Sequence, residues 1–218
     1  MNNPQKTPPS YTLGEELVNA ISHGIGAGLA IAALVLLVVS AAFTHNPLYV
    51  VCAAIYGSTL ILMYLFSTLY HSITNPKAKA VFRVFDHSSI FLLIAGTYMP
   101  YALLVIGGAK GITLCAVIWA FAILGIVLNA VNMEKYKIFS YICYVIMGWA
   151  VIFYFKTLVS NMQLGGLIFL VAGGIVYTLG IIFYAFPKLK YMHSIWHFFV
   201  LGGSILHFFS IYLFVIGR

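Results

Sequence analysis

Three short pieces of this sequence contain residue types that bind metals and that are costly to place in an apolar environment. The first piece is Ser67-x-x-x-His71 and the second is Asp86. The third is His193-x-x-x-His197, whose two imidazoles would share one face of a helix, about one turn apart. A helix that presents two imidazoles in this way needs only one or two further ligands to complete a metal site.

The residue types in these pieces match the donor set of an open metal site. Three imidazoles leave the fourth position of a zinc ion free for chemistry, and His71, His193 and His197 could supply them. Asp86 could be a fourth ligand or could bind water on the metal, and Ser67 could orient a ligand or donate to an oxyanion. Alternatively, the histidines lie at the membrane surface and contact lipid headgroups. Spacing alone leaves both interpretations open.

The composition is that of a membrane protein. Of the 218 residues, 63% are hydrophobic and only 7% are charged, whereas soluble domains carry about 25% charged residues. We therefore expect a multi-pass protein with one membrane domain. The net charge of +7 does not indicate a nucleic-acid partner, because it falls in loops between apolar segments and forms no patch on a soluble surface. The expected partners are membrane lipids.

Seven apolar runs are long enough to cross a membrane as helices, which takes about 20 residues each. Their connections are short, so neighbouring helices should run antiparallel in an up-down bundle. Continuous apolar runs also lack the alternation of a transmembrane β-barrel. The expected fold is all-α, a seven-transmembrane helix bundle over residues 15–218 after a short polar cytoplasmic tail over residues 1–14. The runs lie near residues 17–43, 48–71, 85–106, 112–132, 138–158, 164–186 and 193–216.

The basic residues of the loops predict the orientation. Cytoplasmic loops of membrane proteins carry an excess of lysine and arginine. With the N-terminus in the cytoplasm, eight of the 11 basic residues lie inside and only Lys110, Lys156 and Arg218 lie outside. A cytoplasmic N-terminus and an extracytoplasmic C-terminus are therefore favoured. The inner residues are Lys6, Lys77, Lys79, Arg83, Lys135, Lys137, Lys188 and Lys190.

This orientation brings the metal-binding residue types to one depth. The second span ends at His71, the third begins at Asp86 and the seventh begins at His193. All three positions lie at the cytoplasmic face, and Ser67 and His197 each lie about one helical turn, roughly 6 Å, deeper. We therefore expect the metal site near the cytoplasmic side of the membrane.

A second polar stripe opens the first span. Glu15, Asn19, Ser22 and His23 share one side of a helix. They could line the same cavity, but we favour helix capping and solvation at the interface. We do not expect His23 to be a ligand, because three other histidines already fit.

Two further histidines are placed by helix geometry. His207 lies ten residues beyond His197, which is about 15 Å along a helix and off its face, so it should form an interhelical hydrogen bond. His87 follows Asp86 but should point about 100° away from it.

The motifs Ser-x-x-x-His, Phe-Asp-His-Ser-Ser-Ile and His-Ser-Ile-Trp-His, on a seven-span scaffold, resemble the hemolysin III proteins. These are bacterial members of the progestin and adipoQ receptor family, which includes the adiponectin receptors. The stretches Glu-Glu-Leu-Val-Asn-Ala-Ile-Ser-His-Gly-Ile-Gly and Leu-Ile-Ala-Gly-Thr-Tyr-Met-Pro also look like this family. The resemblance covers essentially the full chain.

The resemblance implies a zinc ion held by His71, His193 and His197. It also implies that Asp86 approaches the metal through water and that Ser67 lies near. A bacterial member would reside in the inner (plasma) membrane. The wider superfamily includes alkaline ceramidases, which cleave a lipid amide.

Three functions follow as hypotheses. The first is an intramembrane zinc hydrolase of a lipid amide or ester, with Asp86 as general base. The second is a membrane sensor or receptor with a structural zinc, in which a ligand shifts helix packing. The third is a membrane-damaging, hemolytic pore, although the spans show no regular charged stripe to line a wide channel. We rank the hydrolase first, because a three-histidine site leaves a position free for chemistry.

Overall fold

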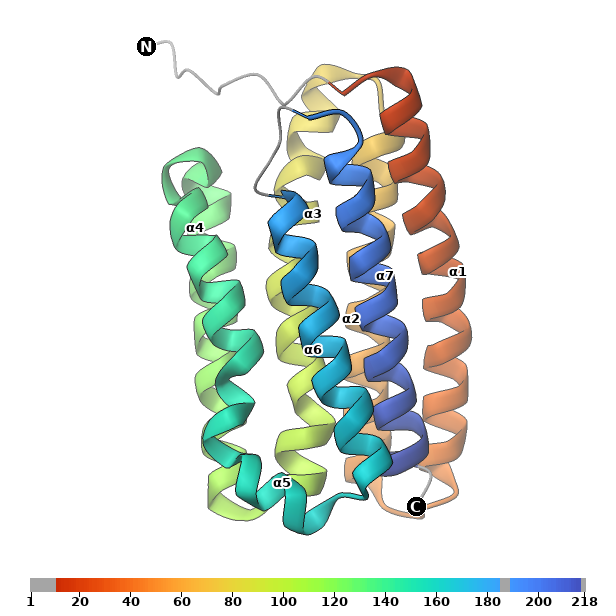
Figure 1. Cartoon of the computed structure of the whole chain (residues 1–218), viewed down its shortest axis with the longest axis vertical. Coiled ribbons are helices and arrows are strands. Elements are labelled where there is room, and N and C mark those ends of the chain that lie inside the picture. The colour runs from red at the N-terminus through yellow and green to blue at the C-terminus, as the bar shows by residue number, and fades with distance from the viewer. Residues whose placement is uncertain (1–10, 185–188, 217–218) are drawn as a thin grey trace.

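The computed structural model describes residues 11–184 and 189–216, and these fold into a bundle of antiparallel helices (Figure 1). Residues 1–10 of the predicted tail, and the loop charges Lys6, Lys188 and Arg218, lie outside the described residues. The α-helices are α1 (Leu13–Ala42), α2 (Pro47–Ser72), α3 (Pro76–Pro100), α4 (Gly108–Trp149), α5 (Phe155–Asn161), α6 (Leu164–Tyr184) and α7 (Met192–Ile211). Short π-helical or 3-10 segments extend them at η1 (Tyr101–Ile106), η2 (Ala150–Tyr154) and η3 (Tyr212–Ile216).

Side-chain caps determine where the first three helices begin. The hydroxyl of Thr12 caps α1 in a reciprocal pair with Glu15, and Asn46 and Asn75 cap α2 and α3. A proline follows each of these two asparagines, where its missing N–H costs nothing and its fixed φ suits a helix. The predicted third run, near 85–106, therefore starts too late, because α3 starts at Pro76 and carries Lys77, Lys79 and Arg83 in its first turns.

The long helix α4 contains a reversal of the chain at Asn132. The backbone of Asn132 is extended, with φ −163° and ψ 89°, and its side chain accepts a hydrogen bond from the backbone N–H of Lys135 at 3.0 Å. This is the geometry of a helix N-cap. The hydroxyl of Ser140 donates to Asn129 Oδ1 at 2.9 Å, although eleven residues of straight helix would separate them by about 16 Å.

We call residues 108–131 and 133–149 the first and second limbs of α4. Figure 1 shows the second limb running back alongside the first. Six helices among the described residues are long and apolar enough to cross a membrane, and the one from Gly108 to Asn161 includes both limbs. The predicted runs near 112–132 and 138–158 thus correspond to one interrupted helix, with its break confined to Asn132.

The bundle exposes apolar side chains and buries polar ones. On α1, Ile21 and Ile25 are 60% and 57% exposed, whereas Asn19 and His23 are 0% and 3% exposed. Exposed apolar faces on long helices are stable in lipid and costly in water. The chain is therefore a multi-pass membrane protein, as the composition predicts.

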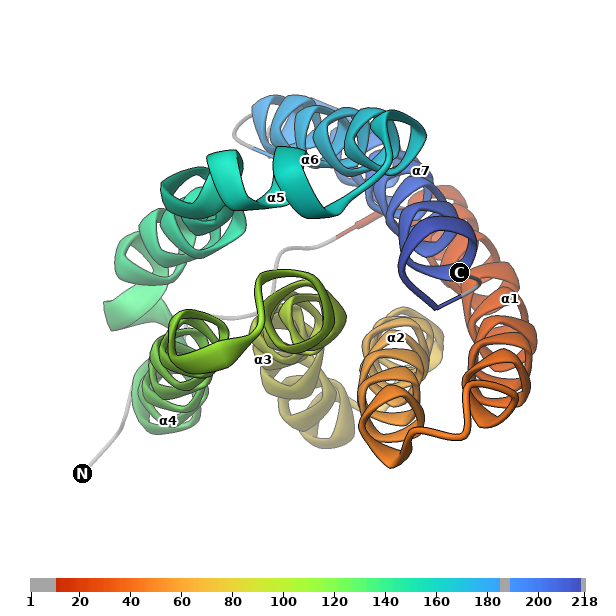
Figure 2. The ribbon, with the colours of Figure 1, turned by 90° about the horizontal axis from the view of Figure 1, so that it is seen from below.

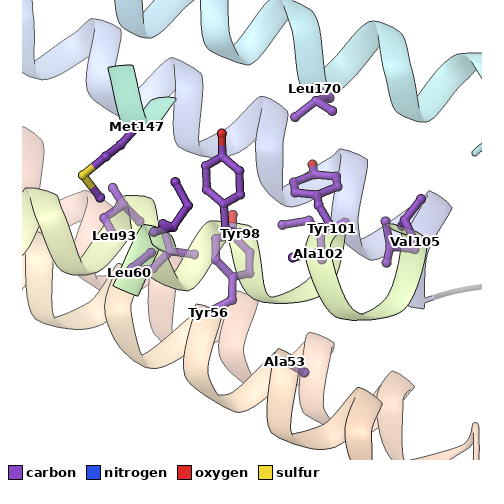
Figure 3. Packing of buried hydrophobic residues seen from close by; sticks show 14 of the residues in the cluster. Ala53, Tyr56, Leu60, Leu93, Tyr98, Tyr101, Ala102, Val105, Met147 and Leu170 are labelled. Carbon is purple, nitrogen blue, oxygen red and sulfur yellow. The ribbon is translucent and has the colours of Figure 1, made fainter. Parts of the chain in front are cut away.

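Buried tyrosines pack among aliphatic side chains in the hydrophobic core (Figure 3). Tyr56 on α2, Tyr98 on α3 and Tyr101 on η1 are each at most 5% exposed. The hydroxyl of Tyr98 donates to the carbonyl of Gly148 at 3.2 Å and accepts from the backbone N–H of Val151 at 2.8 Å. This tyrosine therefore connects α3 to the end of α4.

The opposite end of the bundle gathers the starts of α1 and α7 and the end of α2. Figures 1 and 2 both place α7 beside α1, although the two are separated by most of the sequence. Glu15 Oε1 accepts a hydrogen bond from the backbone N–H of Tyr191 at 2.8 Å, so the first turn of α1 holds the residue before α7. The predicted metal-binding residues all belong to this end.

Candidate metal centre

The structure brings together the three predicted ligand histidines, which we call the histidine group. His71 lies in the last turn of α2, and His193 and His197 lie in the first turns of α7. One ring nitrogen from each residue lies within 4.8 Å of the other two. His193 Nε2 and His197 Nε2 are 3.1 Å apart. The spacing argument for α7 and the depth argument for His71 are therefore both consistent with the structure.

Glu16 orients the ring of His71. Its Oε2 lies 2.6 Å from His71 Nδ1, and its Oε1 lies 2.7 Å from Lys79 Nζ. Nδ1 must carry the proton to donate to a carboxylate, which leaves the lone pair of Nε2 free. A carboxylate behind an imidazole in this way is a common support for a metal ligand.

A hydroxyl from α1 orients the ring of His197 in a similar way. The hydroxyl of Ser22 donates to the carbonyl of Asn19 at 3.0 Å, so its oxygen can accept from His197 Nδ1 at 3.5 Å. The lone pair of His197 Nε2 then faces His193. The side-chain oxygen of Asn19 accepts a hydrogen bond from the hydroxyl of Ser194 at 2.7 Å, so Asn19 connects α1 to the start of α7.

Several buried polar atoms at this end have no hydrogen-bond partner among the described residues. They include His71 Nε2, Ser67 Oγ and both ring nitrogens of His23. Each such atom costs about 1–3 kcal/mol if it stays unsatisfied, so a group of them indicates a bound ion or water.

The nitrogen geometry fits a metal ion. Two imidazole nitrogens on one tetrahedral zinc ion are about 3.3 Å apart, given zinc–nitrogen distances near 2.05 Å. The separation of His193 Nε2 and His197 Nε2 is 3.1 Å, and the free nitrogen of His71 is the third donor. A group of three neutral imidazoles suits zinc and other transition metals better than magnesium or calcium.

Asp86 and Ser67 lie on the wall of the same cavity as His193 and His197. Asp86 is not among the atoms that lie within 4.8 Å of one another, so the arrangement favours a carboxylate near the metal over a fourth ligand. Its Oδ2 lies 3.5 Å from His87 Nδ1. Ser67 is fully buried with an unpartnered hydroxyl, free to donate into this space.

The polar stripe on α1 is buried rather than solvated. Glu15 does cap its helix, as predicted, but Asn19, Ser22 and His23 pack against the histidine group. His23 stacks on His197 with ring centroids 3.6 Å apart. The preference for solvation at the interface was wrong, because the start of α1 is covered by α2 and α7.

The sequence reasoning missed Glu16 and underestimated His87. Glu16, Asn19 and His23 are spaced i, i+3 and i+7 and so share a helix face, a signal that could have identified Glu16. His87 does not point away from Asp86 but lies beside it, 3.5 Å away. The prediction for His207 is confirmed, since its Nε2 lies 3.1 Å from the carbonyl oxygen of Leu170 on α6.

A large apolar cavity extends from this polar end into the bundle. Its empty volume is about 1080 Å³, including the part that is open to the surroundings. Below the polar residues its walls come from α2, α3, the second limb of α4, α6 and α7, with side chains such as Met63, Ile94, Trp149, Ile181 and Val200. Its predominantly apolar lining suits an alkyl chain.

Comparison with known proteins decides the family. The family model described as "Haemolysin-III related" matches residues 11–208. The chain belongs to the haemolysin-III family. That matched range includes His71, His193 and His197.

Members of the haemolysin-III family resemble the chain over nearly its whole length. It is 46% identical to "Hemolysin-3" of Bacillus cereus over 202 residues, covering 93% of this chain and 92% of the relative. It is 42% identical over 201 residues to "Hemolysin-3 homolog" of Bacillus subtilis (strain 168), with coverage of 92% and 94%. A more distant relative, 28% identical over 169 residues, is the human "Monocyte to macrophage differentiation factor", with coverage of 74% and 69%.

In this haemolysin-III protein, Tyr11 covers the histidine group from the N-terminal side. Its ring stacks on His193 with centroids 5.1 Å apart and tilts against His71 at 5.6 Å. Burial raises the pKa of the Tyr11 hydroxyl, so the phenol stays neutral and can donate a proton in a hydrogen bond. The histidine group is thus covered by an aromatic ring that carries a hydroxyl group.

Proposed function

We propose that this protein is a metal-dependent hydrolase that cleaves an amide or ester bond of a lipid, with zinc as its metal. The observation that supports this proposal is the position of the histidine group. Three imidazole nitrogens lie within 4.8 Å of one another at the polar end of an apolar cavity of about 1080 Å³. A lipid with its alkyl chain in this cavity would present its carbonyl group to the polar end.

The fit of zinc rests on the clustered ring nitrogens of His71, His193 and His197, which would hold it. When bound, zinc would supply Lewis acidity, polarising a carbonyl oxygen and making a water molecule more acidic. Glu16 and Ser22 would keep the ligand rings in the required tautomer.

Asp86 is the proposed general base. Its carboxylate would take a proton from the attacking water and return it to the leaving amine or alcohol. His87 Nδ1 lies 3.5 Å from this carboxylate, but its N–H donates to the carbonyl oxygen of Arg83 at 2.9 Å. The unpartnered hydroxyl of Ser67 would donate a hydrogen bond to the oxygen that gains negative charge. The apolar walls of the cavity would exclude bulk water.

We further propose seven passes through the membrane, within one domain over residues 15–218. The reversal at Asn132 supports counting the two limbs of α4 as two passes. The N-terminus and the short tail 1–14 would then lie in the cytoplasm and the C-terminus outside. The distribution of loop lysines supports this orientation. The metal centre would lie near the cytoplasmic face of a bacterial inner membrane.

The test uses the full-length protein purified without a chelator or His-tag. The wild type loaded with zinc should release fatty acid from at least one lipid of an amide and ester panel. His197→Ala should lose both metal and activity. Asp86→Asn should keep the metal but lose about 10²–10⁴-fold in rate, the usual contribution of a general base. His45→Ala, at an exposed loop position, is the matched histidine control and should behave as wild type.

Two other results would contradict the hydrolase. If zinc stabilises the protein against heat but no lipid is turned over, the metal is structural and the protein fits a membrane sensor. The name "Hemolysin-3" of the Bacillus cereus relative suggests membrane damage as another activity. Dye release from liposomes, beyond that of heat-inactivated protein, would favour such a pore.

A further inference from the structure

A second cavity lies at the same end of the bundle, beside the histidine group. Its empty volume is about 730 Å³, including the part open to the surroundings. Its lining includes several side chains that end in polar groups. These side chains are Tyr11, Tyr70, Arg83, Glu134, Lys137 and Tyr141.

Arg83 is a buried cation in this wall with unused hydrogen-bonding capacity. It is only 9% exposed. One terminal nitrogen, Nη2, lies 2.5 Å from Glu134 Oε1, which fixes the guanidinium group. Its Nε is buried and has no hydrogen-bond partner among the described residues. An unsatisfied donor on a buried charged group is costly, so a ligand that accepts this hydrogen bond would be stabilised.

Lys137 adds a second positive charge at this cavity. Within residues 11–184 and 189–216 it forms no ion pair, and its Nζ lies 5.7 Å from the centre of the Tyr141 ring. The lining therefore offers two cations and several phenol hydroxyls as donors. Its carboxylate, that of Glu134, is already paired with Arg83. This donor-rich lining suits an anion with several oxygen acceptors and disfavours a cationic group.

The two cavities meet at shared residues. His87, Tyr184 and His193 line both. The Tyr184 hydroxyl lies 3.1 Å from His87 Nε2 and 3.2 Å from the hydroxyl of Tyr141. A molecule that extended from one cavity into the other would pass beside His193, one of the three candidate metal ligands.

We propose that the second cavity binds the anionic headgroup, of phosphate type, of a lipid whose acyl chain occupies the first cavity. This inference rests on the proposed function for the position of the acyl chain and deepens it by naming the substrate class as anionic lipids. The carbonyl group of such a lipid, between its headgroup and its chain, would lie at the junction, next to the histidine group.

The test measures binding rather than turnover. The full-length protein in detergent micelles is titrated with short-chain phosphatidic acid, with the diacylglycerol of the same chains, and with inorganic phosphate. Charge-assisted hydrogen bonds of about 1.5–3 kcal/mol predict that phosphatidic acid binds roughly tenfold or more tightly than diacylglycerol. Lys137→Gln and Arg83→Gln should each remove most of this preference. Arg83→Lys keeps the positive charge and should fold as the wild type does. It should lose only part of the preference for phosphatidic acid.

Lys135→Gln is the matched control, because Lys135 is exposed on the same limb but does not line the cavity. It should keep the preference. Three results would overturn the proposal. The first is equal affinity for phosphatidic acid and diacylglycerol, and the second is an equal loss of the preference in Lys135→Gln and Lys137→Gln. The third is binding of inorganic phosphate without any preference between the lipids. His197→Ala should retain the preference for phosphatidic acid, so failure of the hydrolase and failure of this headgroup site can be told apart.

Discussion

Glu15 and Glu16 are neighbours in the sequence that act on different helices. Glu15 caps α1 and accepts a hydrogen bond from the backbone N–H of Tyr191, just before α7, at 2.8 Å. Glu16 lies 2.6 Å from His71 Nδ1 at the end of α2 and pairs with Lys79. One residue of rotation along α1, about 100°, separates these contacts. At the scale of single residues, therefore, one carboxylate positions a helix and the other orients a candidate ligand.

Replacing Glu16 should weaken metal binding without removing a ligand. Glu16→Gln leaves a weaker acceptor for His71 Nδ1, and loss of such a support typically costs about 10–100-fold in metal affinity. Competition with a zinc chelator measures this loss. Glu15→Gln, which alters a helix cap, should lower the unfolding temperature and leave the affinity near that of the wild type. Equal affinities for Glu16→Gln and the wild type would show that Glu16 does not support the site.

The sequence predicted the histidine group but not most of its supports. His193 and His197 follow from their spacing, and His71 follows because its span ends at the same membrane face. The contacts of Glu16 and His87 depend on how helices rotate against one another, which spacing along one helix does not reveal. Burial of the α1 stripe was also missed, because it requires knowing that α7 returns beside α1 (Figure 2).

At the scale of elements, α4 shows how a single asparagine divides a long apolar helix. Hydropathy located both limbs, since apolar runs reflect membrane thickness rather than local geometry. It placed the run for the second limb near residues 138–158, whereas the helical conformation is lost only at Asn132. It also missed the start of α3 at Pro76. Hydropathy marks where polar residues occur, but caps decide where helices begin.

The cap at Asn132 should contribute measurably to stability. Asn132→Ala removes the acceptor for the Lys135 N–H and should lower the free energy of unfolding by about 0.5–2 kcal/mol. Asn132→Asp retains an acceptor, so its free energy of unfolding should be close to that of the wild type. Thermal unfolding in detergent compares the three proteins. Identical stability of Asn132→Ala and the wild type would mean that the reversal is held by other contacts, such as Ser140 to Asn129.

At the scale of the whole molecule, polar groups are gathered at one end of an otherwise apolar bundle. The histidine group, both carboxylates of α1 and the second cavity all lie where α1 and α7 begin. The outward faces are largely apolar, and the remaining interior is mainly apolar with scattered polar groups such as Tyr98, Ser204 and His207. The molecule therefore has two chemically different ends, and the proposed orientation assigns the polar end to the cytoplasm.

Labelling of single cysteines can test the number of passes. The three native cysteines, Cys52, Cys115 and Cys143, are first replaced by alanine. If the two limbs of α4 are separate passes, Lys110→Cys and Ser160→Cys should react with an impermeant reagent from the same side. Lys135→Cys should react from the opposite side. If positions 110 and 160 are labelled from opposite sides, the chain crosses the membrane only once between them. That result would contradict seven passes.

The contact between α1 and α7 has a consequence for biosynthesis. The ribosome makes Glu16, Asn19 and Ser22 early, with His71 following in α2, but His193 and His197 belong to the last of the described helices. A nascent chain that has inserted only α1 and α2 holds one of the three candidate ligands, His71, together with Glu16, and lacks the other two. If these histidines hold the proposed metal, the site can be completed only after α7 has docked beside α1. Metal content would thus report on completed assembly in the cell, and not only on the capacity for chemistry.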